Sequence, residues 1–126
     1  MLACVTGEDC TLGPDSLGES STIEDGGAFV RSVCYSSKIL DGADIGPFVR
    51  IRPGSVIGSS VHVGNFVEVK NSTIGADTKI SHLSYIGDSD LGTGINIGCG
   101  CATAKYSGNK KSRTTIKDRA IIGCHT

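Results

Sequence analysis

Large aromatic side chains are scarce in this sequence, which has no Trp and an aromatic content of only 5%. A conventional globular core would therefore lack its largest anchors. Proline is also rare, with three residues, whereas glycine is abundant, with 18. Glycine without a strict Gly-X-Y period excludes collagen, and recurring β-branched residues exclude disorder. The composition instead predicts one domain of short strands and frequent turns.

An excess of charge of one sign is missing too, because the formal net charge is −1. Near neutrality gives no global electrostatic argument for binding nucleic acid. No apolar run is long enough to span a membrane, so we expect no membrane partner. The N-terminal segment ending at Cys4 has no signal-peptide apolar stretch before it. The expected location is the cytoplasm.

The sequence has six cysteines but no C-x-x-C pair. In a reducing compartment, such isolated thiols are more often small apolar fillers than metal ligands or disulfide partners. We therefore interpret the cysteines as structural residues. They are Cys4, Cys10, Cys34, Cys99, Cys101 and Cys124.

An aliphatic residue recurs every six positions over much of the chain. A helix requires a period near 3.6 and a flat sheet a period of 2, so neither explains the repeat. A short strand followed by a tight turn does, and the glycine that often follows the aliphatic residue relieves such a turn. The repeat includes Leu17, Ile23, Phe29, Ile39, Ile45, Ile51, Ile57, Val63, Val69, Ile74, Ile80, Ile86, Leu91, Ile97, Ile116 and Ile122.

Three six-residue units close one triangular coil of about 18 residues, with the aliphatic side chains stacked inside. This pattern resembles the left-handed parallel β-helix family, and the left hand is taken from that resemblance. The predicted fold is all-β, a single left-handed parallel β-helix over 1–126 with roughly seven coils. The repeat fails between Thr103 and Thr115. This polar, basic segment predicts a loop of about residues 104–114, extruded from one corner and functional or part of an interface. The alternative is that the corner merely tolerates an insertion.

Arg52 and Lys70 are 18 positions apart, so stacking places them at the same point on adjacent coils. A guanidinium and an ammonium group about one strand spacing apart suit a bound phosphate group. The alternative is a solvated edge on which Glu68 neutralises Lys70.

His82, Tyr85 and Asn96 are expected to share one corner region on adjacent coils. A neutral histidine near an anion site is a candidate general base, although a lone histidine is more often an ordinary surface residue. The other histidines are His62 and His125. Because His62 precedes an aliphatic position and His82 follows one, they point differently, and no metal site is predicted.

Four ordered segments carry a more specific signal. They are IGPFVRIRPG at 45–54, HVGNFVEVKN at 62–71, SHLSYIGD at 81–88 and NIGCG at 96–100. The first is similar to the pattern G-P-F-x-x-x-R-P-G of the bifunctional N-acetylglucosamine-1-phosphate uridyltransferase/glucosamine-1-phosphate acetyltransferase. Together the segments resemble the acetyltransferase (C-terminal) domain of that hexapeptide-repeat family, most strongly over about 39–100.

The resemblance implies acetyl transfer from acetyl-CoA to the amine of glucosamine-1-phosphate in UDP-N-acetylglucosamine biosynthesis. By position in the matched segments, Arg52 and Lys70 would hold the phosphate. His82 would be the general base that takes a proton from the sugar amine. Tyr85 and Asn96 would position the sugar.

Further roles follow from the same resemblance. Lys111, in the basic loop, aligns with a lysine that helps to bind substrate, and Cys99 and Cys124, which occur in some relatives, are assigned to the acetyl-CoA site. The family needs no metal in this domain. Its members are homotrimers with sites between chains, so the loop is expected to serve a neighbour's site.

Three departures from the family matter. The uridyltransferase domain is absent, so we expect no formation of UDP-sugar by this chain. The family continues for several more coils that complete the coenzyme A site, whereas this chain stops at Thr126, which predicts an incomplete acetyl-CoA site and open strand edges. Lys105 stands where the family has an Asn near the acetyl group, and a cation there would disturb the protonation of His82.

Two functions therefore remain open from the sequence. The first is the acetyltransferase. The alternative is a non-catalytic trimeric β-helix fragment that retains at most a sugar-phosphate pocket. A weaker third possibility is acetyl transfer to a different amine or hydroxyl, for which the sequence gives no positive sign.

Overall fold

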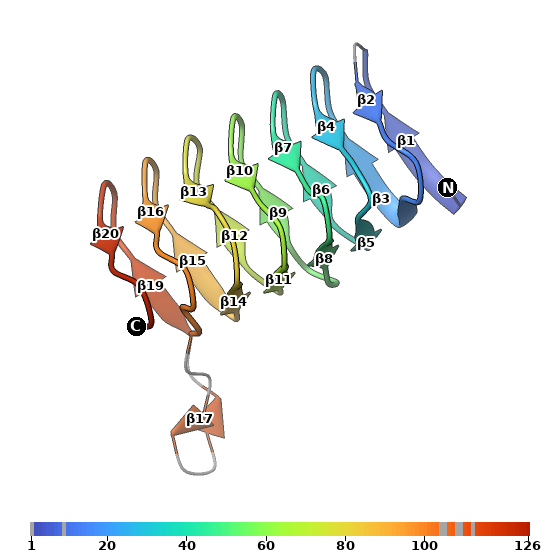
Figure 1. Cartoon of the computed structure of the whole chain (residues 1–126). Helices are drawn as coiled ribbons and strands as arrows, with labels where there is room; N and C mark the ends of the chain where they lie inside the picture. Colours follow the sequence, from blue (N-terminus) through green and yellow to red (C-terminus); the bar gives the residue numbers. More distant parts are fainter. Residues whose placement is uncertain (1, 9, 104–105, 108–109, 112) are drawn as a thin grey trace.

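A computed structural model gives the fold and describes residues 2–8, 10–103, 106–107, 110–111 and 113–126. Every regular element in this part of the chain is a β-strand. The coils stack along one axis, with the two termini at opposite ends of the stack (Figure 1). The structure is a left-handed parallel β-helix, which confirms the predicted fold class.

The strands stack into three faces. Face 1 consists of β5 (Val33–Tyr35), β8 (Val49–Ile51), β11 (Val67–Lys70) and β14 (Ser84–Gly87). Face 2 consists of β6 (Lys38–Ile39), β9 (Val56–Ile57), β12 (Thr73–Ile74), β15 (Ser89–Leu91) and β19 (Thr114–Ile116). Face 3 consists of β2 (Thr11–Leu12), β4 (Ala28–Phe29), β7 (Asp44–Ile45), β10 (His62–Val63), β13 (Lys79–Ile80), β16 (Asn96–Ile97) and β20 (Ile121–Ile122).

The first coils join two of these faces. The long strand β3 (Leu17–Ile23) pairs with β1 (Leu2–Thr6) on one side. On its other side β3 pairs with both β5 and β6, so faces 1 and 2 form one continuous sheet at this end. The N-terminal coils therefore follow the same parallel pairing as the rest of the solenoid.

The repeating aliphatic side chains fill the interior of the coils. Ile45, Ile51 and Ile57 each have an exposed fraction of 0%, because each ends a strand with its side chain pointing inward. The upstream Phe29 is also fully buried, whereas Ile116 in the last coil is only partly buried. The six-residue repeat thus predicted the core correctly from Ile23 to Ile97, whereas Leu17 is only partly buried and lies outside the core cluster.

Buried serine hydroxyls add hydrogen bonds between coils where face 1 meets face 2. The amide of Ser37 donates to the Oγ of Ser21 at 3.3 Å, and the amide of Ser55 donates to the Oγ of Ser37 at 3.2 Å. Further along, the amide of Ser89 donates to the Oγ of Ser72 at 3.0 Å. A buried polar group without a hydrogen-bond partner costs free energy. These hydrogen bonds therefore favour serine over other small residues at these positions.

The faces meet at three corners, and each corner repeats a residue with positive φ. Corner A, between faces 3 and 1, contains Asp15, Arg31, Phe48, Phe66, Leu83, Gly100 and His125. Corner B, between faces 1 and 2, contains Ser20, Ser36, Gly54, Asn71 and Asp88. Corner C, between faces 2 and 3, contains Gly26, Gly42, Ser60, Asp77, Gly94 and Arg119.

One insertion leaves the stack at corner B, as the failure of the repeat predicted. It contains a small antiparallel hairpin of β17 (Tyr106–Ser107) and β18 (Lys110–Lys111), which projects away from the coils (Figure 1). Before the insertion, the Oγ1 of Thr103 accepts from the amide of Gly87 at 2.8 Å. After it, the amide of Thr114 donates to the carbonyl oxygen of Asp88 at 3.1 Å. Both ends are therefore fixed to the preceding coil.

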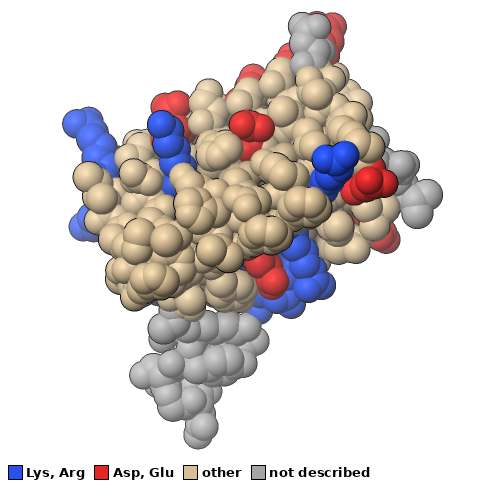
Figure 2. Space-filling view, viewed as in Figure 1, with Lys and Arg blue, Asp and Glu red and all other residues tan. Residues whose placement is uncertain are grey.

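The surface carries charges of both signs. On the side shown in Figure 2, acidic and basic side chains are scattered among a larger area of other residues. Among the residues that the structure describes, no helix has the length and apolarity that crossing a bilayer requires.

Candidate active site

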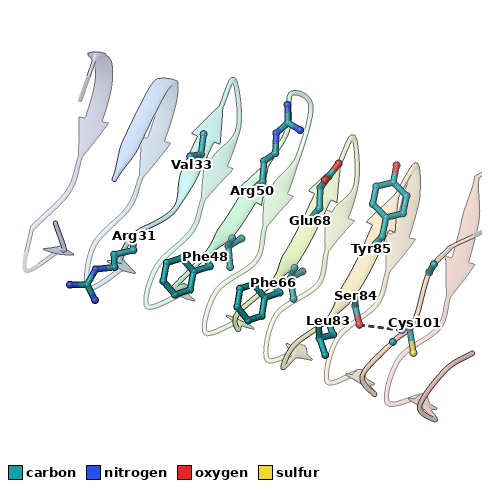
Figure 3. A pocket seen from close by; sticks show the side chains of 14 residues that line it. Arg31, Val33, Phe48, Arg50, Phe66, Glu68, Leu83, Ser84, Tyr85 and Cys101 are labelled. Carbon is teal, nitrogen blue, oxygen red and sulfur yellow. Dashed lines mark hydrogen bonds between the residues drawn. The ribbon is translucent and has the colours of Figure 1, made fainter. Parts of the chain in front are cut away.

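A shallow groove of about 710 Å³ runs along face 1 and across several coils. Its floor is formed by a row of side chains in register, and one wall is formed by corner A (Figure 3). The residues labelled along it are Arg31, Val33, Phe48, Arg50, Phe66, Glu68, Leu83, Ser84, Tyr85 and Cys101. The groove therefore combines side chains of face 1 with those of corner A.

The wall of the groove is an exposed apolar ridge, formed by Phe48, Phe66 and Leu83. Their exposed fractions are 55%, 57% and 56%. The rings of Phe48 and Phe66 are stacked, with centroids 5.7 Å apart and planes 7° from parallel. Large apolar side chains aligned at the surface over consecutive coils are typical of an interaction surface.

The floor of the groove carries polar residues in one register. Arg50 pairs with Glu68, and Glu68 pairs with Tyr85, on consecutive strands of face 1. The ring of Tyr85 lies over Gly87, where a Cβ atom would collide with it. Because Gly87 pairs with Lys70, the hydroxyl end of Tyr85 is directed toward the end of face 1 that carries Lys70.

Arg52 and Lys70 do stack on adjacent coils at this end of face 1, since the amide of Arg52 donates to Val69 at 2.7 Å. The Nη1 of Arg52 lies 3.0 Å from the Oε2 of Glu68. The Nζ of Lys70 lies 3.6 Å from the Oδ2 of Asp88. The alternative from the sequence, in which Glu68 neutralises Lys70, is therefore wrong in its partners, because Glu68 pairs with Arg52 and Asp88 pairs with Lys70.

Asp88 is a buried carboxylate at corner B, with an exposed fraction of 8%. Besides Lys70, it accepts a hydrogen bond from the Nδ2 of Asn71 at 3.0 Å. The side chains of Lys70 and Asp88 are only 21% and 11% exposed, against 35% and 34% for Arg52 and Glu68. Two cations and two carboxylates thus alternate along this edge, with the arginine pair the more accessible.

His82 lies at corner A, next to the ridge, and its side chain is exposed. Tyr85 follows it on face 1, whereas Asn96 lies on face 3 in register with Lys79. His82 and Tyr85 lie beside corner A, whereas Asn96 begins β16 and lies nearer in sequence to Gly94 of corner C than to Gly100 of corner A. Within one chain, however, Tyr85 and Asn96 are on different faces, because one follows the corner and the other precedes it.

The remaining histidines lie elsewhere. His62 is on face 3, with its Nδ1 3.1 Å from the Oδ2 of Asp44, and His125 is at corner A of the last coil. In the described residues, His, Cys, Asp and Glu side chains form no group of three or more that could hold a metal ion.

Two cysteines meet beyond His82 along corner A. β16 and β20 pair in register, which aligns Cys99 with Cys124, and their Sγ atoms are 3.4 Å apart. The thiol hydrogen bond to Cys124, followed by desolvation, raises the pKa of the Cys99 thiol above its usual value.

The interpretation of the cysteines as apolar fillers is confirmed for Cys34 and Cys101, which are buried, but it is wrong for Cys124, which is exposed. The side chain of Cys4 lies outside the described residues. Sequence spacing missed the meeting of Cys99 with Cys124, because the inserted loop lengthens their separation to 25 residues and hides the coil repeat.

Arg113 closes the insertion and was not predicted from the sequence. Its Nη2 and Nε lie 2.8 and 3.0 Å from the two carboxylate oxygens of Asp90. It also donates to the carbonyl oxygens of Asn71 and Ser89, both at 3.2 Å. The hydrogen bonds from Arg113 lower the pKa of Asp90, and the pKa of Arg113 is raised in turn. This clamp fixes the base of the hairpin that carries Lys111, while Lys105 lies outside the described residues.

The sequence is similar to that of curated bacterial proteins. It is 50% identical over 121 residues to bifunctional protein GlmU of Geobacillus sp. (strain WCH70), which covers 96% of this chain and 26% of that protein. It is 47% identical over 122 residues to bifunctional protein GlmU of Clostridium kluyveri, which covers 97% of this chain and 27% of that protein. The chain thus spans about a quarter of the length of these relatives. No family model matches the chain.

The fold is similar to that of a solved structure, PerB from Caulobacter crescentus in complex with CoA and GDP-perosamine. The TM-score is 0.71 at 18% identity, over 79% of this chain and 52% of PerB. At this identity the likeness concerns the fold alone.

Proposed function

The chain is a hexapeptide-repeat β-helix related to the acetyltransferase region, the C-terminal quarter, of bifunctional GlmU proteins, and on that premise we propose its function. It transfers the acetyl group of acetyl-CoA to the amine of glucosamine-1-phosphate, a step in the biosynthesis of UDP-N-acetylglucosamine. The observation that carries this proposal is the 50% identity over 121 residues. The side chains of face 1 and corner A supply groups suited to the reaction.

The phosphate group is bound by Arg52 and Lys70. A guanidinium has five N–H donors, and Arg52 uses its Nη1 for Glu68, so it offers further donors to a phosphate without releasing the carboxylate. Lys70 contributes a second positive charge on the next coil. Glu68 and Asp88 hold both cations in place before the substrate arrives, which reduces the entropy lost on binding.

Chemistry takes place between the sugar amine and the thioester. As the amine nitrogen bonds to the thioester carbonyl carbon, His82 accepts a proton from that nitrogen. The carbon–sulfur bond then breaks, the electron pair leaves with the coenzyme A sulfur, and a proton returns to it. Tyr85, directed toward the phosphate end, orients the sugar so that the amine reaches the thioester.

In a homotrimer, each active site would combine residues from two chains. Asn96 lies on face 3, across corner A from Tyr85, so a second chain seated against the corner would bring its own Asn96 to the first chain's groove. The ridge of Phe48, Phe66 and Leu83 is the apolar surface such a contact would bury. In a closed cyclic trimer, the apolar ridge of every subunit would be covered by a neighbouring subunit. The hairpin carrying Lys111 then serves a neighbouring site.

Acetyl-CoA is the co-substrate and sits near the far end of corner A. The PerB structure, which shares the fold, holds CoA, and this supports a CoA site on a β-helix of this kind. We place Cys99 and Cys124 at that site because they follow His82 along the same corner.

The test measures the formation of N-acetylglucosamine-1-phosphate from acetyl-CoA and glucosamine-1-phosphate. Mass spectrometry detects the product, and a reductant is present in the assay. His82→Ala should lower kcat by about 100-fold or more, the usual range for loss of a general base. His62→Ala is the matched control, because His62 lies on face 3 beside Asp44, and it should retain activity.

Two results would contradict the proposal. One is the absence of acetylated product from a folded chain that still binds the sugar phosphate, which would favour a non-catalytic remnant. The other is an equal loss in both histidine variants, which would remove His82 from the reaction.

A further inference from the structure

The pair of cysteines at corner A is the starting point. Cys99 follows β16 and Cys124 follows β20, and these strands are adjacent and parallel, with Asn96 opposite Ile121 and Ile97 opposite Ile122. The same register aligns Cys99 with Cys124, and their Sγ atoms are 3.4 Å apart. Cys99 is partly exposed and Cys124 is exposed, so small molecules in solution reach the pair.

The backbone places this pair within reach of a covalent bond. Neighbouring strands lie about 4.8 Å apart, and disulfides join Cα atoms about 4.4–6.8 Å apart. The two sulfur atoms need only approach from 3.4 Å to about 2.05 Å, the length of a disulfide bond. Side-chain rotation supplies that movement, so the coils need not shift.

The neighbouring Cys101 is a poor competitor for the same bond. It is 4% exposed, inside the solenoid. Its Sγ lies 3.1 Å from the carbonyl oxygen of Gly123 and 4.0 Å from that of Cys99. Its thiol thus points at backbone groups rather than at another sulfur.

We propose that Cys99 and Cys124 form a reversible intrachain disulfide, a modification site that joins two consecutive coils at corner A. The oxidant is a low-molecular-weight disulfide of the oxidised-glutathione class. The bond joins residues that are 25 positions apart, so the loop between them becomes a closed ring. The proposal does not depend on acetyl transfer.

The exchange proceeds in two steps that balance. The thiolate of Cys124, the more exposed sulfur, attacks one sulfur of oxidised glutathione and releases one glutathione thiolate. Cys99 then loses its proton and attacks the Cys124 sulfur of the mixed disulfide, and the second glutathione leaves. The two protons lost by the cysteine thiols are taken up by the two glutathione thiolates, and two electrons pass to the oxidant. Because its hydrogen bond raises the pKa of Cys99, this residue suits the second step rather than the first.

The test counts thiols in the full chain after equilibration with glutathione buffers of increasing oxidised fraction, followed by acid quenching and alkylation. The reduced chain has six thiols, and oxidation should remove two of them. Trypsin should then release the peptide of residues 80–105 joined to that of 120–126, and dithiothreitol should separate them.

Variants assign the bond, because the peptide of residues 80–105 contains both Cys99 and Cys101. Cys99→Ser and Cys124→Ser should each abolish the joined peptide. Cys101→Ser is the matched control and should retain it. The proposal is overturned if the six thiols all remain alkylatable in excess oxidised glutathione, if the joined peptide survives in Cys99→Ser, or if the bond links two chains on a non-reducing gel.

Discussion

Corners A and C have the same backbone conformation, but the side chains that they expose differ in size and polarity. Both repeat a residue with positive φ on nearly every coil. At corner C this residue is small or polar over most of the stack, as in Gly42, Ser60 and Gly94, whereas the middle of corner A has Phe66 and Leu83. A side chain with positive φ costs roughly 1–2 kcal/mol compared with glycine.

The difference shows that the turn itself does not require bulky residues. Corner C makes the same turn with glycine, so the phenylalanines of corner A are retained against the preference of the backbone. They also remain more than half exposed, at 55% for Phe48 and 57% for Phe66. A residue that costs stability in its own chain and buries little there is expected to act on something outside the chain. This is why we place the subunit contact and the active site beside corner A.

The largest effect is expected from a charge in the apolar ridge. Phe66→Glu should weaken self-association by about 30-fold or more, since truncating a central anchor typically costs over 2 kcal/mol. Ser60→Glu places the same charge on a residue of similar φ at corner C and should leave association unchanged. Sedimentation equilibrium measures both. If the two variants associated equally strongly, the two corners would not differ in their role in self-association.

A methyl group added beneath Tyr85 should show whether the position of this ring matters for activity. In Gly87→Ala, the added Cβ would collide with the Tyr85 ring, so the ring must move. We expect kcat/KM to fall about tenfold or more, because small displacements of positioning groups are costly. Gly123→Ala is the control, since nothing lies within 4 Å of a Cβ at that position. Unchanged kcat/KM in Gly87→Ala would remove Tyr85 from the site.

The smallest effect concerns the clamp at the loop. Arg113→Ala should lower the free energy of unfolding by about 1 kcal/mol, because the pair with Asp90 is partly exposed. Arg119→Ala, at corner C, should change it by less than about 0.5 kcal/mol. Urea unfolding distinguishes them, and similar losses would show that Arg113 does not anchor the loop.

The same pair predicts a pH dependence. Arg113 holds the pKa of Asp90 below its usual value of 3.8. The stabilisation is therefore fully present above pH 3.8 and is lost as the pH falls through the lowered pKa. The difference in stability between the wild-type chain and Asp90→Asn should narrow over that range, and a difference that stays constant would contradict the assignment.

Much of the fold followed from periodicity alone. The six-residue repeat located Ile45, Ile51 and Ile57 in the core because burial at every third of a coil leaves a direct trace in the sequence. It also placed Arg52 beside Lys70. It could not show that Asp88 rather than Glu68 pairs with the lysine, because that depends on which way side chains turn at corner B.

The site was less accessible to sequence reasoning. Residue roles for His82 and Asn96 came from resemblance, and periodicity did not reveal that Asn96 lies on another face from Tyr85. Cys124 and Arg113 follow the inserted loop, where the 18-residue spacing no longer relates one coil to the next. The sequence does not show which residues come into contact across such an insertion, because the path of the inserted loop is not encoded in the repeat.

If face 1 binds a sugar phosphate for acetylation, its residues should distinguish glucosamine-1-phosphate from glucosamine as acceptors. Arg52→Ala should reduce kcat/KM at least about tenfold for the phosphorylated sugar, the loss expected for a charge-assisted hydrogen bond. It should have little effect on glucosamine, which has no phosphate for Arg52 to bind. Lys38→Ala, on face 2, should affect neither acceptor. Equal losses for both sugars in Arg52→Ala, or no loss for either, would show that Arg52 does not bind the phosphate group.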